Sequence, residues 1–386
     1  MFSPFIINDK NLFLDRFPVS QVNRSLQAWD AADEYLINYI TENSLVKEKS
    51  NILIFNDTFG ALTTNLSIDG NQIYCVNDSL LSEQGIKYNL EQNHLATDNI
   101  HYLTSLNSLP RDIALVVFKI PKSKSLLNYQ LLQIKNTYPE SLIFIAGDRA
   151  KEIHSSTLKI FEKHLGTTTT SLAVKKARLV FCQLDQTSKQ QSPFPTIWDL
   201  EPTYPATTKF TISNHANVYA RDKLDLGARY LLQSLPNVAQ GAKVIDLGCG
   251  NGVLGLTLLA AQPLAEIHFV DESYMAIDSS KTNIEKNLPE LLAQCEFTVN
   301  DCLTNINDRN IDLVVCNPPF HQQTATTDHI AWQMFNDAFR VLKKGGELII
   351  IGNRQLGYHV KLKRIFGNYT EIATNNKFVT LSAKRL

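Results

Sequence analysis

Residues 243–255 read KVIDLGCGNGVLG, and this stretch decides the fold. The run 243–247 is apolar enough for a buried strand, and it leads directly into a turn that contains Gly248, Gly250 and Gly252. Glycine tolerates positive φ and lets a ligand approach the backbone closely. A buried strand that enters a helix through such a turn is typical of a parallel α/β sheet with a ligand at the carboxyl ends of its strands.

The chemistry of this turn separates two classes of ligand. A dinucleotide-binding turn reads G-x-G-x-x-G, whereas this one reads G-x-G-x-G with Asp246 two residues before its first glycine. A carboxylate there would repel a pyrophosphate and attract an ammonium group. The run DLGCGNG resembles the turn that S-adenosylmethionine-dependent methyltransferases present to the methionine part of their cofactor. That resemblance implies cofactor contacts at Asp246, Gly248, Gly250, Asn251 and Gly252.

Two more acidic residues follow the next two predicted strands, 266–270 and 296–299. Asp271 follows the first, where a carboxylate can accept hydrogen bonds from both ribose hydroxyls. The alternative role for Asp271 is to cap the helix predicted over 274–287. Asp301 follows the second strand, and its carboxylate can accept from the exocyclic amine of adenine. Together with the glycine turn, these acids complete a predicted S-adenosylmethionine site.

The strand predicted over 311–315 ends in CNPPF, residues 316–320. In a doubly wound sheet this strand end lies beside the cofactor's methyl group. The Asn317 oxygen and the Pro318 carbonyl can each accept one N–H of an amine whose lone pair is delocalised, which directs that lone pair at the methyl group. The prolines fix φ, and an aromatic ring can stack on a flipped base. We predict a catalytic set of Asn317, Pro318, Pro319 and Phe320, with Asn317 also facing the cofactor. A plain double-proline turn is the alternative.

Apolar runs alternate with amphipathic stretches through both halves of the chain, which predicts α/β architecture throughout. Three blocks of the first half align in order with the second: 52–62 with 244–254, 77–93 with 271–287, and 113–121 with 311–319. Their nearly constant spacing indicates a duplication. We expect two tandem Rossmann-like domains with mostly parallel seven-stranded sheets, as in class I methyltransferases.

The first copy has lost the residues of the predicted site. The alignment replaces Asp246, Gly248, Gly250, Asp271 and Asn317 with Ile54, Asn56, Thr58, Asn77 and Lys119. Apolar strands are kept while the polar groups are gone, so we predict a degenerate domain that serves as a scaffold or holds RNA. Candidate RNA contacts in the two copies are Lys119, Lys122, Lys124, Lys175, Lys176, Arg178, His321, Lys361, Lys363 and Arg364.

Composition sets the remaining limits. The 386 residues are enough for two domains, and the net charge of −1 creates no global field that attracts nucleic acid. The six cysteines form no C-x-x-C pair, which favours a reducing cytoplasm, and the nine histidines show no metal-ligand spacing. We expect no signal peptide, no membrane span and no metal. Pro, Ser, Thr and Gln dominate 185–208, which predicts a linker between domains 1–184 and 209–386.

Several segments are similar to the bacterial rRNA guanine-N2 methyltransferases with duplicated domains. They are 214–236, 244–255, 315–321 and 343–367, and the stretch 14–37 favours the large-subunit type. The resemblance implies methylation of a guanine N2 amine in 23S rRNA, free or in a large-subunit particle; it does not imply an oligomer. The small-subunit 16S rRNA enzyme stays an alternative, as does an adenine-N6 or protein-glutamine methyltransferase, because CNPPF alone names no acceptor. A third hypothesis is a non-catalytic RNA-binding assembly factor, against which the intact site residues argue.

Overall fold

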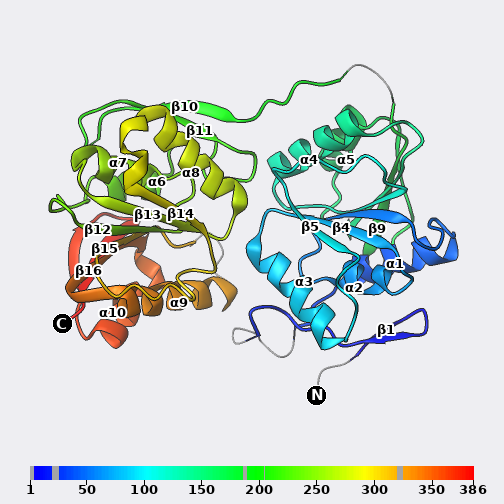
Figure 1. Ribbon diagram of the computed structural model, residues 1–386, viewed down its shortest axis with the longest axis horizontal. Helices are drawn as coiled ribbons and strands as arrows, with labels where there is room; N and C mark the ends of the chain where they lie inside the picture. The colour runs from blue at the N-terminus through cyan, green and yellow to red at the C-terminus, as the bar shows by residue number, and fades with distance from the viewer. Residues whose placement is uncertain (1–3, 20–25, 186–188, 204, 320–324) are drawn as a thin grey trace. The chain divides into compact units, whose positions relative to one another are not determined.

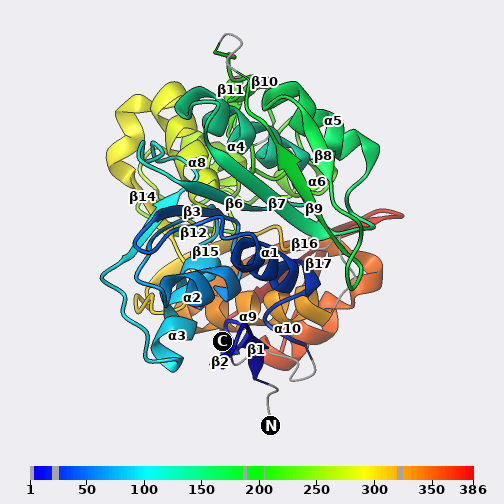
Figure 2. The ribbon, with the colours of Figure 1, turned by 90° about the vertical axis from the view of Figure 1, so that its right-hand side faces the viewer.

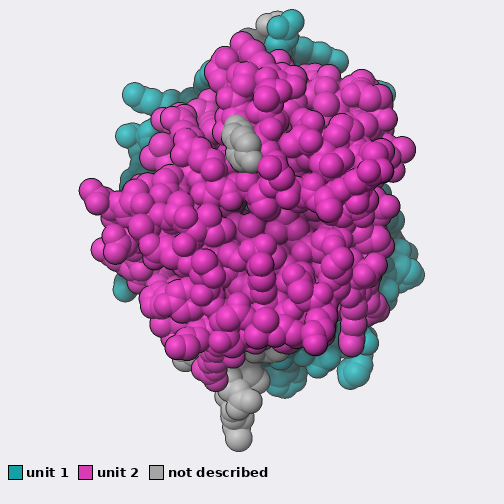
Figure 3. Space-filling view, turned by 90° about the vertical axis from the view of Figure 1, so that its left-hand side faces the viewer, with its two compact units in different colours: residues 1–193 teal, residues 194–386 magenta. Residues whose placement is uncertain are grey.

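The computed structural model describes residues 4–19, 26–185, 189–203, 205–319 and 325–386 (Figure 1). The chain divides into two compact units, residues 1–193 and 194–386, which Figure 3 colours separately. Each unit has its own seven-stranded sheet and its own hydrophobic cores. The expected organisation into two tandem α/β domains is therefore confirmed.

The first unit is a sandwich of helices, sheet and helices. Its elements are β1 (Phe5–Ile7), β2 (Lys10–Leu12), α1 (Ala31–Glu42), β3 (Asn51–Phe55), α2 (Ala61–Ser67), β4 (Gln72–Asn77), α3 (Leu80–Gln92), β5 (Ile100–Thr104), β6 (Leu115–Lys119), α4 (Lys124–Thr137), β7 (Ile143–Arg149), α5 (Ser155–His164), β8 (Thr168–Thr170) and β9 (Ala177–Cys182). Helices α1, α2 and α3 pack on one face of the sheet, and α4 and α5 pack on the other (Figure 1, Figure 2).

The second unit repeats this architecture. Its elements are β10 (Thr196–Leu200), β11 (Phe210–Asn214), α6 (Leu226–Leu232), β12 (Lys243–Leu247), α7 (Val253–Ala261), β13 (Glu266–Asp271), α8 (Tyr274–Asn287), η2 (Pro289–Gln294), β14 (Cys295–Val299), β15 (Ile311–Cys316), α9 (Ala325–Val341), β16 (Leu342–Asn353), η3 (Arg354–Leu356), α10 (Tyr358–Phe366), β17 (Thr370–Thr374) and β18 (Phe378–Lys384). Helices α6, α7 and α8 cover one face of the sheet, and α9 and α10 cover the other (Figure 1).

The two sheets have the same strand order. The first runs β5-β4-β3-β6-β7-β9-β8, and the second runs β14-β13-β12-β15-β16-β18-β17. In each sheet the first five strands pair in parallel, and the strand before the last is antiparallel to both of its neighbours. This agreement confirms the predicted duplication and the predicted class of sheet. The strand order reverses between β12 and β15, which is where ligands bind in doubly wound folds.

A pair of asparagines explains part of the sequence similarity between the copies. On α8, Asn283 donates to and accepts from the backbone of Ser213, and Asn287 does the same with Thr211. On α3, the aligned Asn89 and Asn93 hold the backbone of Asp15 and Phe13 in the same way. Asparagine has both donors and an acceptor on one side chain, so two of them clamp an extended segment to the helix. The matched asparagines are therefore structural.

The expected linker over 185–208 is wrong in its second half. Residues Thr196–Leu200 form β10, which pairs antiparallel with β11 of the second unit. Trp198 on β10 donates from its ring nitrogen to the Arg221 carbonyl at 3.0 Å, and Leu200 is buried. The prolines that mark the stretch, such as Pro202, lie outside the paired residues. A two-stranded ribbon tolerates proline next to its strands. Composition therefore predicted the start of the second domain at residue 209, whereas the second unit begins at residue 194.

The structure bears on two features that were considered from composition: the cysteines and membrane-spanning helices. All six cysteines lie in the described part of the chain, and each is a free thiol. Among the helices that the structure describes, none combines the length and apolar character needed to cross a lipid bilayer.

Candidate active site

The predicted site residues follow neighbouring strands at the carboxyl edge of the second sheet. The residues that pair with Leu247 of β12 are those just before Asp271 on β13 and Asn317 after β15. Gly248, Asp271 and Asn317 therefore lie in one row, and Asp301 follows β14 at the same edge. The sheet register thus brings together side chains that are far apart in the sequence.

The three glycines in the turn after β12 all have positive φ, but the space around them differs. Gly248, Gly250 and Gly252 have φ of 70°, 55° and 77°, in the left-handed region that favours glycine. A Cβ at Gly248 would lie 3.0 Å from Met334 Cε, and one at Gly252 would lie 3.0 Å from Ser280 Cβ. At Gly250 a Cβ would meet no atom within 4 Å. The open side of the turn is therefore at Gly250, where a ligand can approach the backbone.

The side chain of Asn251 points into the protein. Asn251 is buried, and its Nδ2 donates to Asn214 Oδ1 at 2.8 Å. Its carbonyl accepts from Asn283 Nδ2 at 2.9 Å. As placed, Asn251 ties the turn to β11 and α8, and its contribution to a cofactor site is to hold the glycine backbone in position.

Asp246 is a fully buried acid with one unused oxygen. Its Oδ2 accepts from the Gly255 N–H at 2.9 Å, while Oδ1 has no hydrogen-bond partner among the described residues. Burial raises the pKa of Asp246 to about 8. An orphaned buried acceptor is costly, so this position calls for a donor or a cation.

Asp271 and Asp301 occupy the next two strand ends. Asp271 accepts from the Gly250 N–H and from the Ser273 N–H, each at 3.0 Å. Ser273 is the N-cap of α8, so the alternative helix-cap role of Asp271 is wrong. Asp301 accepts from Gln333 Nε2 at 3.1 Å. Burial raises the pKa of both acids, and their carboxylates retain lone pairs for further hydrogen bonds.

Asn317 directly follows β15, and its amide has one used and one unused end. Its Nδ2 lies 3.4 Å from Asp225 Oδ2, and its Oδ1 is buried with no hydrogen-bond partner in the described residues. Pro318 is buried and Pro319 is exposed. The fourth predicted catalytic residue, Phe320, and the candidate substrate contact His321 lie outside the described residues. Within the described ranges, no group of three or more His, Cys, Asp or Glu side chains could hold a metal ion.

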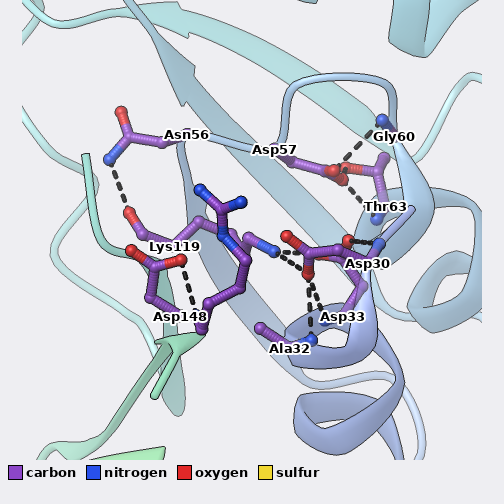
Figure 4. A network of polar contacts seen from close by, with 10 residues as sticks. Asp30, Ala32, Asp33, Asn56, Asp57, Gly60, Thr63, Lys119 and Asp148 are labelled. Carbon is purple, nitrogen blue, oxygen red and sulfur yellow. Dashed lines mark hydrogen bonds and ion pairs between the residues drawn. The ribbon is translucent and has the colours of Figure 1, made fainter. Parts of the chain in front are cut away.

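In the first unit, polar side chains fill the region that aligns with the site (Figure 4). Lys119, at the position of Asn317, lies 2.9 Å from Asp30 Oδ1 and 2.7 Å from Asp33 Oδ1. Its side chain is only 15% exposed. Burial lowers the pKa of Lys119 and the two carboxylates raise it, with a net rise above its usual value. Lys119 was a candidate phosphate contact; that prediction is wrong, because its ammonium group is buried and paired.

Asp57 fills the equivalent turn (Figure 4). It accepts from the Gly60 N–H at 3.0 Å and from the Thr63 N–H and hydroxyl, each at 2.8 Å. Thr63 aligns with Gly255, whose N–H is bound by Asp246 in the second unit. The first unit has thus kept the hydrogen bond and moved the carboxylate from the strand into the turn.

The remaining basic candidates differ in exposure. Lys122 and Lys124 are exposed after β6. Lys175 is exposed but lies 2.8 Å from Glu34. On α10, Lys361 and Arg364 lie 6.0 Å and 5.1 Å from the centre of the Trp332 ring; Lys176 and Lys363 are exposed, and Arg178 is partly buried.

Sequence reasoning missed the residues that hold the site residues in place. Asp225, Gln333 and Asn214 each hydrogen-bond to a predicted site side chain. One signal was available for Asp225: it precedes the apolar helix 226–232 as an N-cap residue does. The partners of Gln333 and Asn214 are set by tertiary packing, which no local pattern reports.

The fold of the second unit is that of a methyltransferase. In agreement, residues 209–382 match the family model of the methyltransferase small domain. Residues 3–186 match the model described as the RLMG N-terminal domain. The solved structure of the T. thermophilus 16S rRNA N2 methyltransferase RsmC, in complex with AdoMet and guanosine, is similar in fold. It has a TM-score of 0.76 and 17% identity, and the similarity covers 100% of this chain and 98% of that one.

Named relatives align with this chain over nearly its whole length. Ribosomal RNA large subunit methyltransferase G of Colwellia psychrerythraea is 62% identical, and the alignment covers 99% of each protein. The protein of the same name from Pseudoalteromonas translucida is 48% identical over 98% of this chain and 97% of the relative. The chain belongs to the ribosomal RNA large subunit methyltransferase G family.

Proposed function

We propose that this chain transfers the methyl group of S-adenosylmethionine to the exocyclic N2 amine of a guanine in 23S rRNA. The observation that carries the proposal is a pair of buried acceptor oxygens, Asp246 Oδ1 and Asn317 Oδ1, which have no partner in the described residues. They belong to adjacent strands of one sheet edge. Buried acceptors without donors cost free energy, and an ammonium group and an exocyclic amine are the donors that would satisfy them.

The residues present fit S-adenosylmethionine. The open face at Gly250 leaves room for its methionine part, and the acidic Asp246 lies under the same turn. Asp271 would accept from the ribose hydroxyls, and Asp301 from the adenine amine. Bound there, the cofactor supplies an electrophilic methyl carbon. All of these groups belong to the second unit.

The acceptor side of the reaction would be served by the strand end after β15. Asn317 Oδ1 would accept one N–H of the guanine N2 amine, and the Pro318 carbonyl would accept the other. Acceptors on both N–H groups localise the nitrogen lone pair and aim it at the methyl carbon. The N–H becomes acidic as the bond forms, so alignment and exclusion of water contribute most of the rate. The stacking role of Phe320 remains a prediction.

The choice of substrate is supported by the relatives. Those that share 48–62% identity carry names that specify the large ribosomal subunit, and RsmC, which has the same fold, is described in complex with AdoMet and guanosine. We therefore favour 23S rRNA or a large-subunit particle, in the cytoplasm, over 16S rRNA, adenine or glutamine. The first unit would act as a scaffold or hold RNA without chemistry of its own.

A labelled-methyl transfer assay tests the proposal. The protein is incubated with radiolabelled S-adenosylmethionine and, separately, with unmodified 23S rRNA, large subunits, 16S rRNA, small subunits, DNA and a release factor. The expected result is label in 23S rRNA or large subunits alone. Label in 16S rRNA, in DNA or in the release factor would replace the proposal with the corresponding alternative, and no label anywhere would favour a non-catalytic assembly factor.

A further inference from the structure

We infer that Asp225 is a positioning residue for methyl transfer: it orients the Asn317 amide so that Oδ1 faces the acceptor amine. The inference rests on the proposed function and adds a residue to it. Asp225 is the N-cap of α6, the helix that precedes the first strand of the catalytic sheet. Its Oδ2 accepts from the Ala228 N–H at 2.9 Å and from Asn317 Nδ2 at 3.4 Å.

The chemistry of the two side chains fixes which end of the amide faces the substrate. An ionised carboxylate has only acceptors, whereas an asparagine amide has an acceptor at one end and two N–H donors at the other. Only the NH₂ end of Asn317 can therefore bond to Asp225, and a flipped amide would set two acceptors against each other. The bond leaves Oδ1 pointing away from Asp225, buried and unpaired in the described residues.

Asp225 is itself held from two sides. The Tyr219 hydroxyl donates to Asp225 Oδ1 at 3.0 Å, while Oδ2 is fixed by the first turn of α6. A carboxylate with both oxygens engaged cannot rotate freely, so it presents Oδ2 to Asn317 in one geometry. Preorganised acceptors of this kind need no rearrangement when the substrate amine arrives.

The first unit provides an independent observation. Asp30 caps α1 there, accepting from the Ala32 N–H at 2.9 Å. It also faces Lys119, the counterpart of Asn317, at 2.9 Å. Both copies thus place a helix-capping aspartate against the residue that ends the fourth strand of the sheet. In the first copy the partner is an ammonium group that forms an ion pair with the carboxylate; in the second copy it is an amide whose oxygen has no partner among the described residues.

Two variants of Asp225, later combined with Asn317→Ala, test the inference in the full-length protein. Asp225→Ser keeps a good N-cap but is too short to reach Asn317. Asp225→Asn keeps both the cap and the reach, because its amide oxygen can take the place of Oδ2 while the Tyr219 hydroxyl accepts from its NH₂ group. Turnover of rRNA should fall by roughly 10- to 100-fold in Asp225→Ser and stay close to the parent in Asp225→Asn. The KM for S-adenosylmethionine should be unchanged in both.

The decisive comparison uses Asn317→Ala as background. If Asp225 acts through Asn317, adding Asp225→Ser to Asn317→Ala should lower kcat no further, since the residues work as a unit. Ser79→Ala, which removes the N-cap of α3 in the first unit, is the control for cap loss and should keep the parental kcat. An equal loss of kcat in both backgrounds, a parallel loss of cofactor affinity, or no loss at all would overturn the inference.

A readout without turnover separates this inference from the proposed function. The Asn317 side-chain amide signals in ¹⁵N-asparagine-labelled protein can be assigned by their absence in Asn317→Ala. They should move in Asp225→Ser and stay near their parental positions in Asp225→Asn. Signals that do not respond to Asp225→Ser would show that the contact does not orient the amide, whichever substrate the enzyme methylates.

Discussion

The ammonium group of Lys119 lies 2.7 Å from Asp33 Oδ1, and both side chains are largely buried. This ion pair occupies the place where the second unit has Asn317, whose amide oxygen has no partner among the described residues. The same position of one duplicated fold therefore holds a largely buried ion pair in the first copy and a proposed site residue in the second. At this position the first unit has a lysine that is paired with carboxylates of its own unit.

Removal of Lys119 should destabilise the protein without affecting the cofactor. Breaking a buried ion pair from one side leaves an uncompensated charge and costs about 3–5 kcal/mol. In Lys119→Met the free energy of unfolding of the first unit should fall by this order, as measured by denaturant titration. Lys175→Ala, which breaks an exposed pair with Glu34, should change little. Equal stability of the two variants, or a new cofactor site in the first unit, would contradict this account.

The size of that loss should depend on pH. Burial raises the pKa of Asp33 to about 6 even beside Lys119, and without the ammonium group it rises further. A carboxyl whose folded-state pKa is raised stabilises at low pH, and this contribution disappears as pH rises through the folded-state pKa. The deficit of Lys119→Met should therefore be smaller at about pH 5 than at about pH 8. A deficit that grows on acidification would show that Asp33 does not carry the uncompensated charge.

Cofactor binding should release a proton from Asp246. Its pKa, raised to about 8 by burial, leaves it neutral below that pH, and a nearby ammonium group favours the carboxylate. Affinity for S-adenosylmethionine should therefore increase between about pH 6 and about pH 7.5, where the cofactor's amino group is still protonated. Calorimetry in buffers of different ionisation enthalpy should show about one proton released by the parent and none by Asp246→Asn. The same proton count in both proteins would remove Asp246 from the cofactor site.

Asp246→Ala and Asn317→Ala should fail in different ways. Loss of a charged hydrogen bond costs about 1.5–3 kcal/mol, so Asp246→Ala should weaken cofactor binding roughly 10- to 150-fold. Asn317→Ala should lower kcat by about 100-fold or more, with cofactor affinity nearly kept. Titration calorimetry and single-turnover kinetics on the same preparations separate the two. If Asn317→Ala weakens cofactor binding as much as Asp246→Ala does, Asn317 belongs to the cofactor and not to the acceptor.

RNA affinity should depend on Lys122 and Lys124. They are exposed after β6, at the carboxyl edge of the first sheet, and each phosphate neutralised adds to the salt dependence of binding. The double change to alanine should weaken rRNA binding and flatten its dependence on salt, while cofactor affinity stays the same. The matched control is Lys47→Ala with Lys49→Ala, which removes two exposed lysines before β3. If the control pair weakens rRNA binding equally, the effect is one of total charge, and Lys122 and Lys124 do not form a specific RNA-binding surface.

Local patterns predicted what local interactions determine. The helix over 274–287 and the strand over 243–247 have the predicted bounds, because periodicity and the glycine turn specify them within a few residues. The row of Gly248, Asp271 and Asn317 also followed from the topology of a parallel sheet.

Non-local pairing accounts for what the sequence could not predict. Strand β10 exists because β11 pairs with it, and its proline-rich surroundings resemble a linker. The burial of Lys119 depends on α1, which is distant in sequence and supplies Asp30 and Asp33. Asp225 faces Asn317 because α6 packs on β16 and β18 of the same sheet. In each case the deciding partner is specified by tertiary packing, which spacing within one segment does not report.

The most direct test of the central claim is nucleoside mass spectrometry of 23S rRNA after reaction with the full-length protein. The account predicts N2-methylguanosine at a single position, formed by the parent and strongly reduced with Asn317→Ala at equal cofactor saturation. Methyl groups on adenine or on another guanine atom, or undiminished N2-methylguanosine with Asn317→Ala, would contradict it.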